Sequence, residues 1–211
     1  ISKLEEYLFD YEFYKLAYPE DTAGLNKTQA LNHFKTVGKF NSYLPSPYFD
    51  PQYYWNTNPD IWNDPNYGTS IDKAYDHFVD YGYWEGRAGS LYFSALDYIT
   101  REENHDAYKL YYPEKEKILY HYTKDGSGGD KSATTVRWTG SDNFSVKEYA
   151  EEYNLKTSEK VIVDGKETTV YYGKKLLREY VASLVRMKNC TTIEQFYDLI
   201  YDENVYMFMN R

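Results

Sequence analysis

Residues 77–82 read His-Phe-Val-Asp-Tyr-Gly, and the same frame of histidine, aromatic residue and glycine occurs at 33–38 and at 121–126. Each of the three histidines, His33, His77 and His121, lies 44 residues from the next. A fixed interval of this length is typical of tandem copies of one supersecondary unit. The sequence therefore predicts that the first 126 residues consist of a short unit present three times.

A second block precedes each of these frames. Residues 13–20 and 107–114 are identical at six of eight positions, and residues 53–60 keep a tyrosine, the proline and an acid. The distance between the two blocks varies, which is expected when a surface loop joins two packed elements. We therefore predict a helical-repeat domain at 1–126, with units at about 9–44, 49–88 and 103–126.

The first block has the features of a short helix. Asp50 is a suitable N-cap, and Pro51 suits the first helical position; Asp10 and Asn104 are expected at the equivalent cap positions. The proline that follows ends this helix, because the residue before a proline resists the helical conformation. Each unit should therefore begin with a short capped helix.

The second block predicts a longer helix that ends at a glycine. In the middle copy Ser70 is the expected N-cap, and the glycines at 38, 82 and 126 are expected to adopt a left-handed conformation. The apolar face of this helix should comprise Ile71, Ala74, Tyr75, Phe78 and Val79.

The middle copy resembles a known repeat, with Phe49–Tyr54, Asn58–Ile61 and His77–Arg87 as the matching stretches. The pattern, FDPxYYxxxNPDV followed by HFxxYGxxEGR, recurs in tandem in large exported bacterial proteins, among them surface proteins and adhesins and some with glycan-handling domains. The resemblance implies an exported, extracellular or cell-surface helical-repeat protein, and it implies no reaction. Glu-Gly-Arg occurs only in the middle copy, so a clasp between Arg87 and an acid of the neighbouring unit would occur once.

The remainder, residues 127–211, is predicted to be a small α+β region. Gly126–Asp130 is the expected boundary. Helices are expected at 145–153, capped by Ser145, and at 192–201, capped by Thr191 or Thr192 with Ile193, Phe196, Tyr197 and Ile200 facing inward. A further helix is expected at 174–187, and its apolar face should comprise Leu176, Leu177, Tyr180, Val181, Leu184 and Val185. A β-hairpin is expected around Asp164-Gly165, with a turn longer than two residues, and it should pack on the helices or the repeats.

The composition limits the partners. The net charge is -9, and lysine and arginine form no basic stripe, which disfavours nucleic acid and anionic membranes. No run of about 18 apolar residues is present, so no membrane span is expected. The sequence contains 27 tyrosines, and most of them are expected to fill the core with their rings while their hydroxyls find polar partners.

Catalytic and metal-binding patterns are weak, and we expect no enzyme and no cofactor. The three histidines are expected to hydrogen-bond neighbouring carbonyls, with a shared metal as the less favoured alternative. Asp60, Asn63, Asp64 and Asn66 form an oxygen-rich loop that could bind calcium, although an ordinary turn is the favoured interpretation. Cys190 is the one thiol and a weak candidate nucleophile.

The tryptophans suggest a ligand. Trp55 replaces a lysine found in the two sister copies, so its position is expected to face solvent. Aromatic rings with Asp, Asn and Gln nearby suit sugars, whose C–H faces stack on rings. The predicted binding residues are Trp55, Trp62, Tyr67, Trp84 and Trp138, and packing anchors are the alternative reading. We expect a non-catalytic module that binds a polysaccharide or cell-surface glycan, or instead a spacer that contacts other surface proteins without a sugar site.

Overall fold

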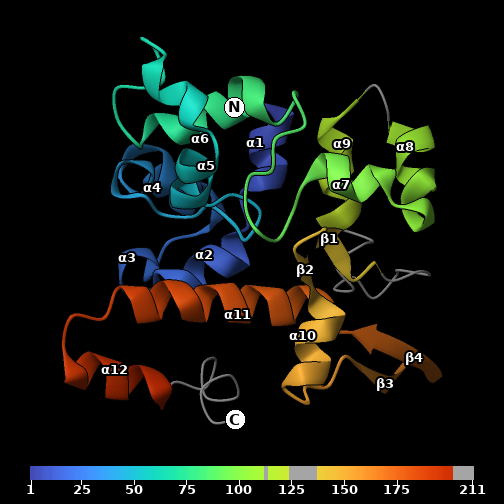
Figure 1. The fold of residues 1–211 in the computed structure, drawn as a ribbon. Helices are drawn as coiled ribbons and strands as arrows, with labels where there is room; N and C mark the ends of the chain where they lie inside the picture. The colour runs from blue at the N-terminus through green and yellow to red at the C-terminus, as the bar shows by residue number, and fades with distance from the viewer. Residues whose placement is uncertain (112–113, 124–136, 202–211) are drawn as a thin grey trace.

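The computed structural model describes residues 1–111, 114–123 and 137–201, and this part of the chain is mostly helical with a small antiparallel part (Figure 1). The predicted domain boundary at 126–130 and Gly126 lie outside the described residues. The first half of the chain contains α1 (Lys3–Leu8), α2 (Tyr11–Ala17), α3 (Pro19–Thr22), α4 (Lys27–Thr36), η1 (Gly38–Asn41), α5 (Pro51–Thr57), η2 (Pro59–Asn63), α6 (Lys73–His77), η3 (Phe78–Gly82), α7 (Ala95–Thr100), η4 (Glu102–Asn104), α8 (His105–Tyr111) and α9 (Glu116–His121). The second half contains β1 (Thr139–Ser141), β2 (Phe144–Ser145), α10 (Val146–Glu152), β3 (Ser158–Val163), β4 (Lys166–Tyr171), α11 (Gly173–Lys188) and α12 (Ile193–Ile200).

Three helices of the first half begin in the same way, with an N-cap residue that directly follows a buried phenylalanine. The Asp10 carboxylate accepts from the Phe13 amide, and the Asp50 carboxylate accepts from the amides of Gln52 and Tyr53. The hydroxyl of Ser94 accepts from the Asp97 amide at the start of α7. A side-chain oxygen thus satisfies a backbone donor that would otherwise lack a partner at each of these helix starts.

Each of these starts is hydrogen-bonded to a segment about 40 residues further along the chain. The amide of Asp10 donates to the Pro45 carbonyl at 3.0 Å, and the amide of Asp50 donates to the Gly89 carbonyl at 3.0 Å. The amide of Ser94 donates to Gly140 in the same way, again at 3.0 Å. The helices between these anchor points pack in pairs, α2 with α4, α5 with α6, and α7 with α9. The same local closure therefore occurs three times.

The third closure does not begin where the sequence blocks suggested. Its capped helix is α7, which starts after Ser94, whereas residues 107–111 belong to α8. Tyr108, aligned from the sequence with the buried Tyr14, is 48% exposed. Asn104 directly precedes α8, but its side-chain amide donates to the carbonyl of Tyr98 and its side-chain oxygen accepts from Arg137. The alignment of 107–114 with 13–20 is therefore wrong in space, although the letters match.

The N-terminal helix α1 lies among these helix pairs (Figure 1). Its Glu5 carboxylate accepts from Lys35 of α4 and, at 3.1 Å, from the Tyr75 hydroxyl of α6. The ring of Tyr7 lies 5.0 Å from that of Tyr120 in α9. One short helix thus contacts α4, α6 and α9, so these helices surround α1 instead of standing in a row.

The start of the second helix in the middle segment differs from the expectation. The helix α6 begins at Lys73, with Asp72 before it and no side-chain cap, and the Ser70 hydroxyl instead donates to the Asp72 carboxylate. Of the predicted apolar face, Ala74, Tyr75 and Phe78 are buried.

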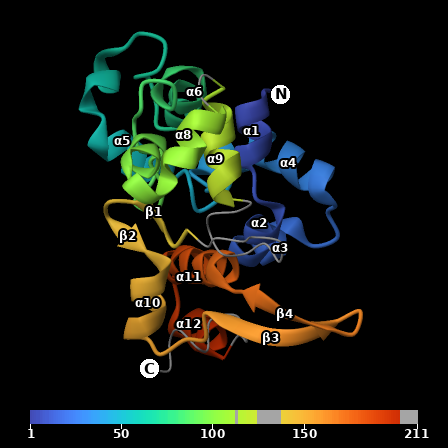
Figure 2. The ribbon, with the colours of Figure 1, turned by 90° about the vertical axis from the view of Figure 1, so that its right-hand side faces the viewer.

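The second half of the chain folds back on the first. The long helix α11 lies between the helices of the first half and the layer formed by α10, α12 and the hairpin β3–β4 (Figures 1 and 2). It packs along α2, where the Arg178 guanidinium donates to the Asp10 carboxylate at 2.7 Å. Leu176, Leu177 and Val181 of the predicted face are buried, and so is Ala182, which lies outside that face.

Among the described residues, two antiparallel hairpins are present where one was expected. The additional one pairs β1 with β2 and leads directly into α10, whose N-cap is Ser145 as predicted. In the expected hairpin the strands are longer than predicted, so the turn consists of only Asp164 and Gly165. Both have positive φ, 51° and 76°, which is the combination of a type I′ turn.

The expected packing of the hairpin and of α12 is wrong in part. Ile162 and Val163 of β3 are exposed, because the hairpin projects away from the helices (Figure 2). The helix α12 begins at the predicted cap Thr192, yet Ile193 and Tyr197 are exposed and Leu199 is the buried residue. The two elements therefore contribute little to the core.

Candidate binding site

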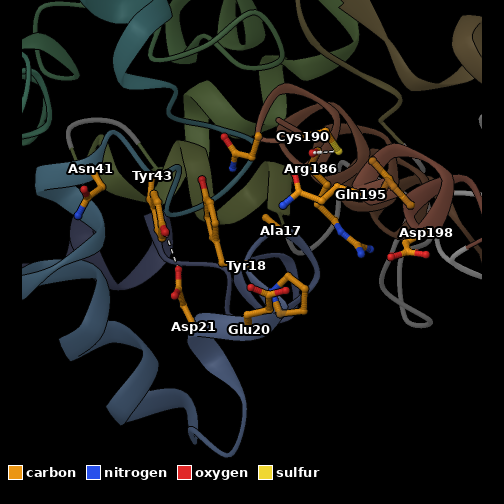
Figure 3. Close-up of a pocket in the computed structure, with 13 residues that line it drawn as sticks. Ala17, Tyr18, Glu20, Asp21, Asn41, Tyr43, Arg186, Cys190, Gln195 and Asp198 are labelled. Atoms are coloured by element: carbon orange, nitrogen blue, oxygen red, sulfur yellow. Dashed lines mark hydrogen bonds between the residues drawn. The ribbon is translucent and has the colours of Figure 1, made fainter. Parts of the chain in front are cut away.

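A groove separates the first helices from the C-terminal helices. Its cavity of about 590 Å³ is bounded by α2, α3 and η1 on one side and by α11 and α12 on the other (Figure 3). No sequence signal pointed to it, because its two walls lie more than 140 residues apart in the chain. Its lining residues are Ala17, Tyr18, Pro19, Glu20, Asp21, Asn41, Tyr43, Arg186, Asn189, Cys190, Gln195, Asp198 and Leu199.

One wall of the groove is a stacked pair of tyrosines. The rings of Tyr18 and Tyr43 are parallel within 1°, with centroids 3.8 Å apart, and Figure 3 shows them side by side. The Tyr43 hydroxyl donates to the Asp21 carboxylate at 2.5 Å, and the Tyr18 hydroxyl accepts from the Leu44 amide. Partial burial and the Asp21 contact raise the pKa of Tyr43 to about 12, so both tyrosines are neutral at physiological pH.

The opposite wall carries polar groups with unused hydrogen-bonding capacity. Within the described residues the side chains of Asn189 and Asp198 make no hydrogen bond, and the Gln195 carbonyl caps α12 while its amide nitrogen stays unused. Such groups suit a polar ligand that brings its own donors and acceptors. The groove can therefore hold an extended polar ligand. Tyr18 and Tyr43 stack on each other, so little of their ring faces is left for a ligand to stack on.

A smaller cavity of about 260 Å³ continues the groove along α11. It shares Tyr18, Asn41, Tyr43 and Asn189 with the larger cavity and extends to Asp50 and Tyr92. The two cavities together follow the second half of α11.

The predicted residues Trp55 and Trp62 lie together on the surface. Their ring centroids are 6.2 Å apart and the planes are tilted by 32°, so the rings form an angled ledge and not a flat one. The Trp62 indole N–H donates to the Trp55 carbonyl at 3.0 Å, which fixes the ring. Trp62 is 47% exposed, whereas Trp55 is partly buried against the core. The expectation that position 55 faces solvent is thus met only in part.

The other three predicted residues do not join this ledge. The Tyr67 hydroxyl donates to Asp80, and its ring packs edge-on against His77 and Tyr81. The Trp84 indole donates to the Val79 carbonyl. Trp138 packs against Tyr171 of the hairpin. These rings serve local packing.

The repeated histidines bond tyrosine hydroxyls, not the carbonyls that we expected. The distances from hydroxyl oxygen to Nδ1 are 2.8 Å for Tyr14 and His33, 2.8 Å for Tyr54 and His77, and 2.7 Å for Tyr98 and His121. All three histidines therefore lie in one local setting. Burial, together with the positive charge of Arg87, lowers the pKa of His77, which favours the neutral ring that this pairing needs.

The glycines that follow these histidines are needed for close packing and not for a left-handed backbone conformation. Gly38 and Gly82 do not have positive φ, contrary to the expected left-handed conformation. A Cβ at these positions would lie 2.4 Å from the Tyr14 hydroxyl oxygen and 1.9 Å from that of Tyr54. Each glycine therefore makes room for the tyrosine that bonds the histidine.

Arg87 forms its clasp within its own segment. Its guanidinium donates to both oxygens of Asp60, at 2.9 and 2.8 Å, and to Asn58. This contact lowers the pKa of Asp60. Arg137 makes the same bidentate contact with Asp106 and also donates to Asn104. The clasp thus occurs twice, where the sequence suggested one between neighbouring units.

The predicted calcium loop is organised by its own side chains. Asp60 is held by Arg87, and one Asp64 oxygen accepts from the amides of Asn66 and Tyr67. In the described part of the chain, no group of three or more histidine, cysteine or acidic side chains is placed to hold a metal ion. The Cys190 thiol lies in the groove and donates to the Arg186 carbonyl.

No known protein family, curated protein or solved structure matches the chain. No helix among residues 1–111, 114–123 and 137–201 has the length and apolar character needed to cross a bilayer.

Proposed function

We propose that the chain is a non-catalytic binding module that takes a polysaccharide on the ledge of Trp55 and Trp62. The observation that carries the proposal is a half-exposed indole held in place by a hydrogen bond to its neighbour's backbone. An exposed ring that is already ordered loses little side-chain entropy when a sugar stacks on it. The chain is proposed to be exported and to act outside the cell or at a bacterial cell surface, as the repeat resemblance implies.

The surroundings of the ledge suit sugar hydroxyls. Gln52 and Asn56 form an exposed hydrogen-bonded pair on α5, the helix that carries Trp55. Asn63 follows Trp62 and is exposed. Amides that can donate and accept are the side chains that a neutral, hydroxyl-rich ligand needs.

We further infer that the three Tyr–His pairs mark three copies of one unit. The inference is supported by the three equal closure bonds and by the three matched helix pairs. This arrangement favours a second candidate function, a spacer or protein-binding element of a surface protein that has no sugar site.

A pulldown with insoluble polysaccharides tests the proposal. We expect the chain to be retained, and Trp62→Ala to weaken retention about fivefold, because a stacked aromatic contact contributes on the order of 1 kcal/mol. Trp55→Ala should weaken it less. Phe40→Ala is the matched control, since it removes a ring that is 58% exposed outside the ledge.

Two results would argue against the proposal in different ways. Retention that survives both tryptophan changes would place the sugar elsewhere, with the groove beside α11 as the next site to examine. An absence of retention on any polysaccharide would favour the spacer function.

A further inference from the structure

A third cavity, of about 310 Å³, lies where α1, α2, the start of α4 and α11 meet the segment between η1 and α5 and the residue Thr123 after α9. It is distinct from the groove and from the tryptophan ledge. Its lining includes Asp10, Lys27, Tyr48 and Arg178, together with Glu6 and Glu12.

The first observation is a buried hydroxyl without a partner. Tyr48 is 2% exposed, and its hydroxyl oxygen makes no hydrogen bond. The equally buried hydroxyls of Tyr14, Tyr54 and Tyr98 all pair with a histidine. Leaving a buried polar group unpaired is costly, so such a group in a cavity wall calls for an acceptor inside the cavity.

The second observation is unused positive charge. Arg178 donates to Asp10 through Nε, and no hydrogen bond in the described chain reaches its two terminal nitrogens. Lys27 forms no ion pair with any described carboxylate. Both members of the Arg178–Asp10 pair act on the Tyr48 hydroxyl, whose pKa is raised by burial and by the Asp10 carboxylate and lowered by Arg178.

The acidic residues around the cavity are already neutralised. Asp10 is paired with Arg178 at 2.7 Å, Glu12 with Lys15 at 3.2 Å, and Glu6 with Lys3 at 3.6 Å. The donors left over are therefore a phenol, two guanidinium nitrogens and an ammonium group. Their shared preference is an anionic oxygen ligand, because charge-assisted hydrogen bonds to a carboxylate are stronger than neutral ones.

We propose that this cavity binds a small carboxylate, with the Tyr48 hydroxyl and the Arg178 guanidinium as its main donors and Lys27 as an outer cation. A volume of about 310 Å³ exceeds that of a single water, which is about 30 Å³. It lies at the lower end of the range for small-molecule pockets. The carboxylate belongs either to a free organic acid or to a uronic-acid residue. The proposal does not depend on the tryptophan ledge.

Calorimetric titration of the full chain at constant ionic strength tests it, with sodium acetate, sodium glucuronate and glucose as probes. We expect at least one of the two carboxylates to bind and glucose not to bind. Binding of acetate alone would indicate a free organic acid, and binding of glucuronate alone would indicate a uronic acid. Tyr48→Phe should weaken the carboxylate that binds about tenfold, and Lys27→Met should weaken it less.

The control variant is Tyr98→Phe, which removes a buried hydroxyl that is already satisfied by His121. It should lower stability and leave the dissociation constant unchanged. Tyr48→Phe should instead raise the unfolding midpoint of the ligand-free chain by about 2–4 °C, because it removes an unpaired buried group. The proposal is overturned if neither carboxylate binds, if glucose binds equally well, or if Tyr48→Phe binds like the unchanged chain.

Discussion

At the scale of single residues, three side chains define the recurring contact. A tyrosine hydroxyl is bonded by a histidine on one side and touched by a glycine on the other, as with Tyr54, His77 and Gly82. The histidine satisfies the buried hydroxyl, and the glycine leaves room for it. The fixed spacing of histidine and glycine in the sequence is explained by this contact, because both residues must lie next to the same tyrosine hydroxyl oxygen.

The contact makes Gly82→Ala a sharp test. The added methyl group would lie 1.9 Å from the Tyr54 oxygen, and we expect this overpacking to lower the free energy of unfolding by about 1–3 kcal/mol. Tyr54→Phe alone should lower it by about 1–3 kcal/mol, because it leaves His77 Nδ1 unpaired. Urea denaturation of both variants and of the double variant measures the effects.

The double variant shows whether Gly82 is needed for space beside the Tyr54 hydroxyl or for its backbone conformation. If the glycine is needed for space, removing the hydroxyl relieves part of the clash, and the double variant is more stable than the sum of the single changes predicts. Strictly additive losses would show that the glycine serves some other purpose.

At the scale of elements, the hairpin β3–β4 is stabilised mainly by its own turn. Its residues Ile162 and Val163 are exposed, so tertiary packing contributes little, and an isolated two-stranded hairpin is only marginally stable. The two left-handed residues Asp164 and Gly165 therefore decide whether the strands stay paired.

Gly165→Ala should open this hairpin while the helical core persists. A non-glycine residue at φ 76° costs on the order of 1–2 kcal/mol. We expect faster amide exchange in residues 158–171 and an unchanged urea midpoint for the helices. Asp164→Asn is the control, since asparagine tolerates a positive φ and should leave exchange unchanged. A drop in the global midpoint with Gly165→Ala would mean that the hairpin is part of the core.

At the scale of the whole molecule, Glu5 of α1 connects two of the helix pairs, through Lys35 of α4 and Tyr75 of α6. This carboxylate is buried and accepts from Lys35, Tyr75 and the Ser2 amide. Burial by itself would raise the pKa of Glu5, but the hydrogen bonds from Lys35, the Ser2 amide and Tyr75, together with the charge of Lys35, outweigh it, and the pKa is lowered below 4.5. Because the folded pKa is the lower one, Glu5 contributes stability above pH 4.5, and this contribution is lost as the pH falls through the folded pKa.

Glu5→Gln should therefore be destabilising at neutral pH, by about 1.5–3 kcal/mol for the lost charged hydrogen bond. The difference between the unchanged chain and the variant should shrink as the pH is lowered below 4.5. Urea denaturation at pH 7 and at pH 3.5 measures both effects. Glu6→Gln, beside it but largely in solvent, should change little. A constant difference across pH would show that the Glu5 carboxylate is not the responsible group.

Much of the local structure could be predicted from residue types and spacing. Asp10, Asp50, Ser145 and Thr192 cap helices as expected, and the face of α11 follows from its apolar period. These features depend on neighbours within a turn or two, where spacing alone fixes the contact. The ledge of Trp55 and Trp62 belongs here, because seven residues separate its members; its role in binding stays a prediction.

Only the tertiary structure decided the remainder. The match of 107–114 with 13–20 pointed to Tyr108 as the partner of His121, but the partner is Tyr98, which is buried between α7 and α9. The local signal for Tyr98 is the Phe93-Ser94 start of α7, which repeats Phe9-Asp10 and Phe49-Asp50. The cavity at Tyr48 and the groove beside α11 require Arg178 and Arg186 to return to the first helices from more than 140 residues away. Residue spacing determined most of the helices and caps, whereas the cavities exist only where segments that are distant in the chain come together.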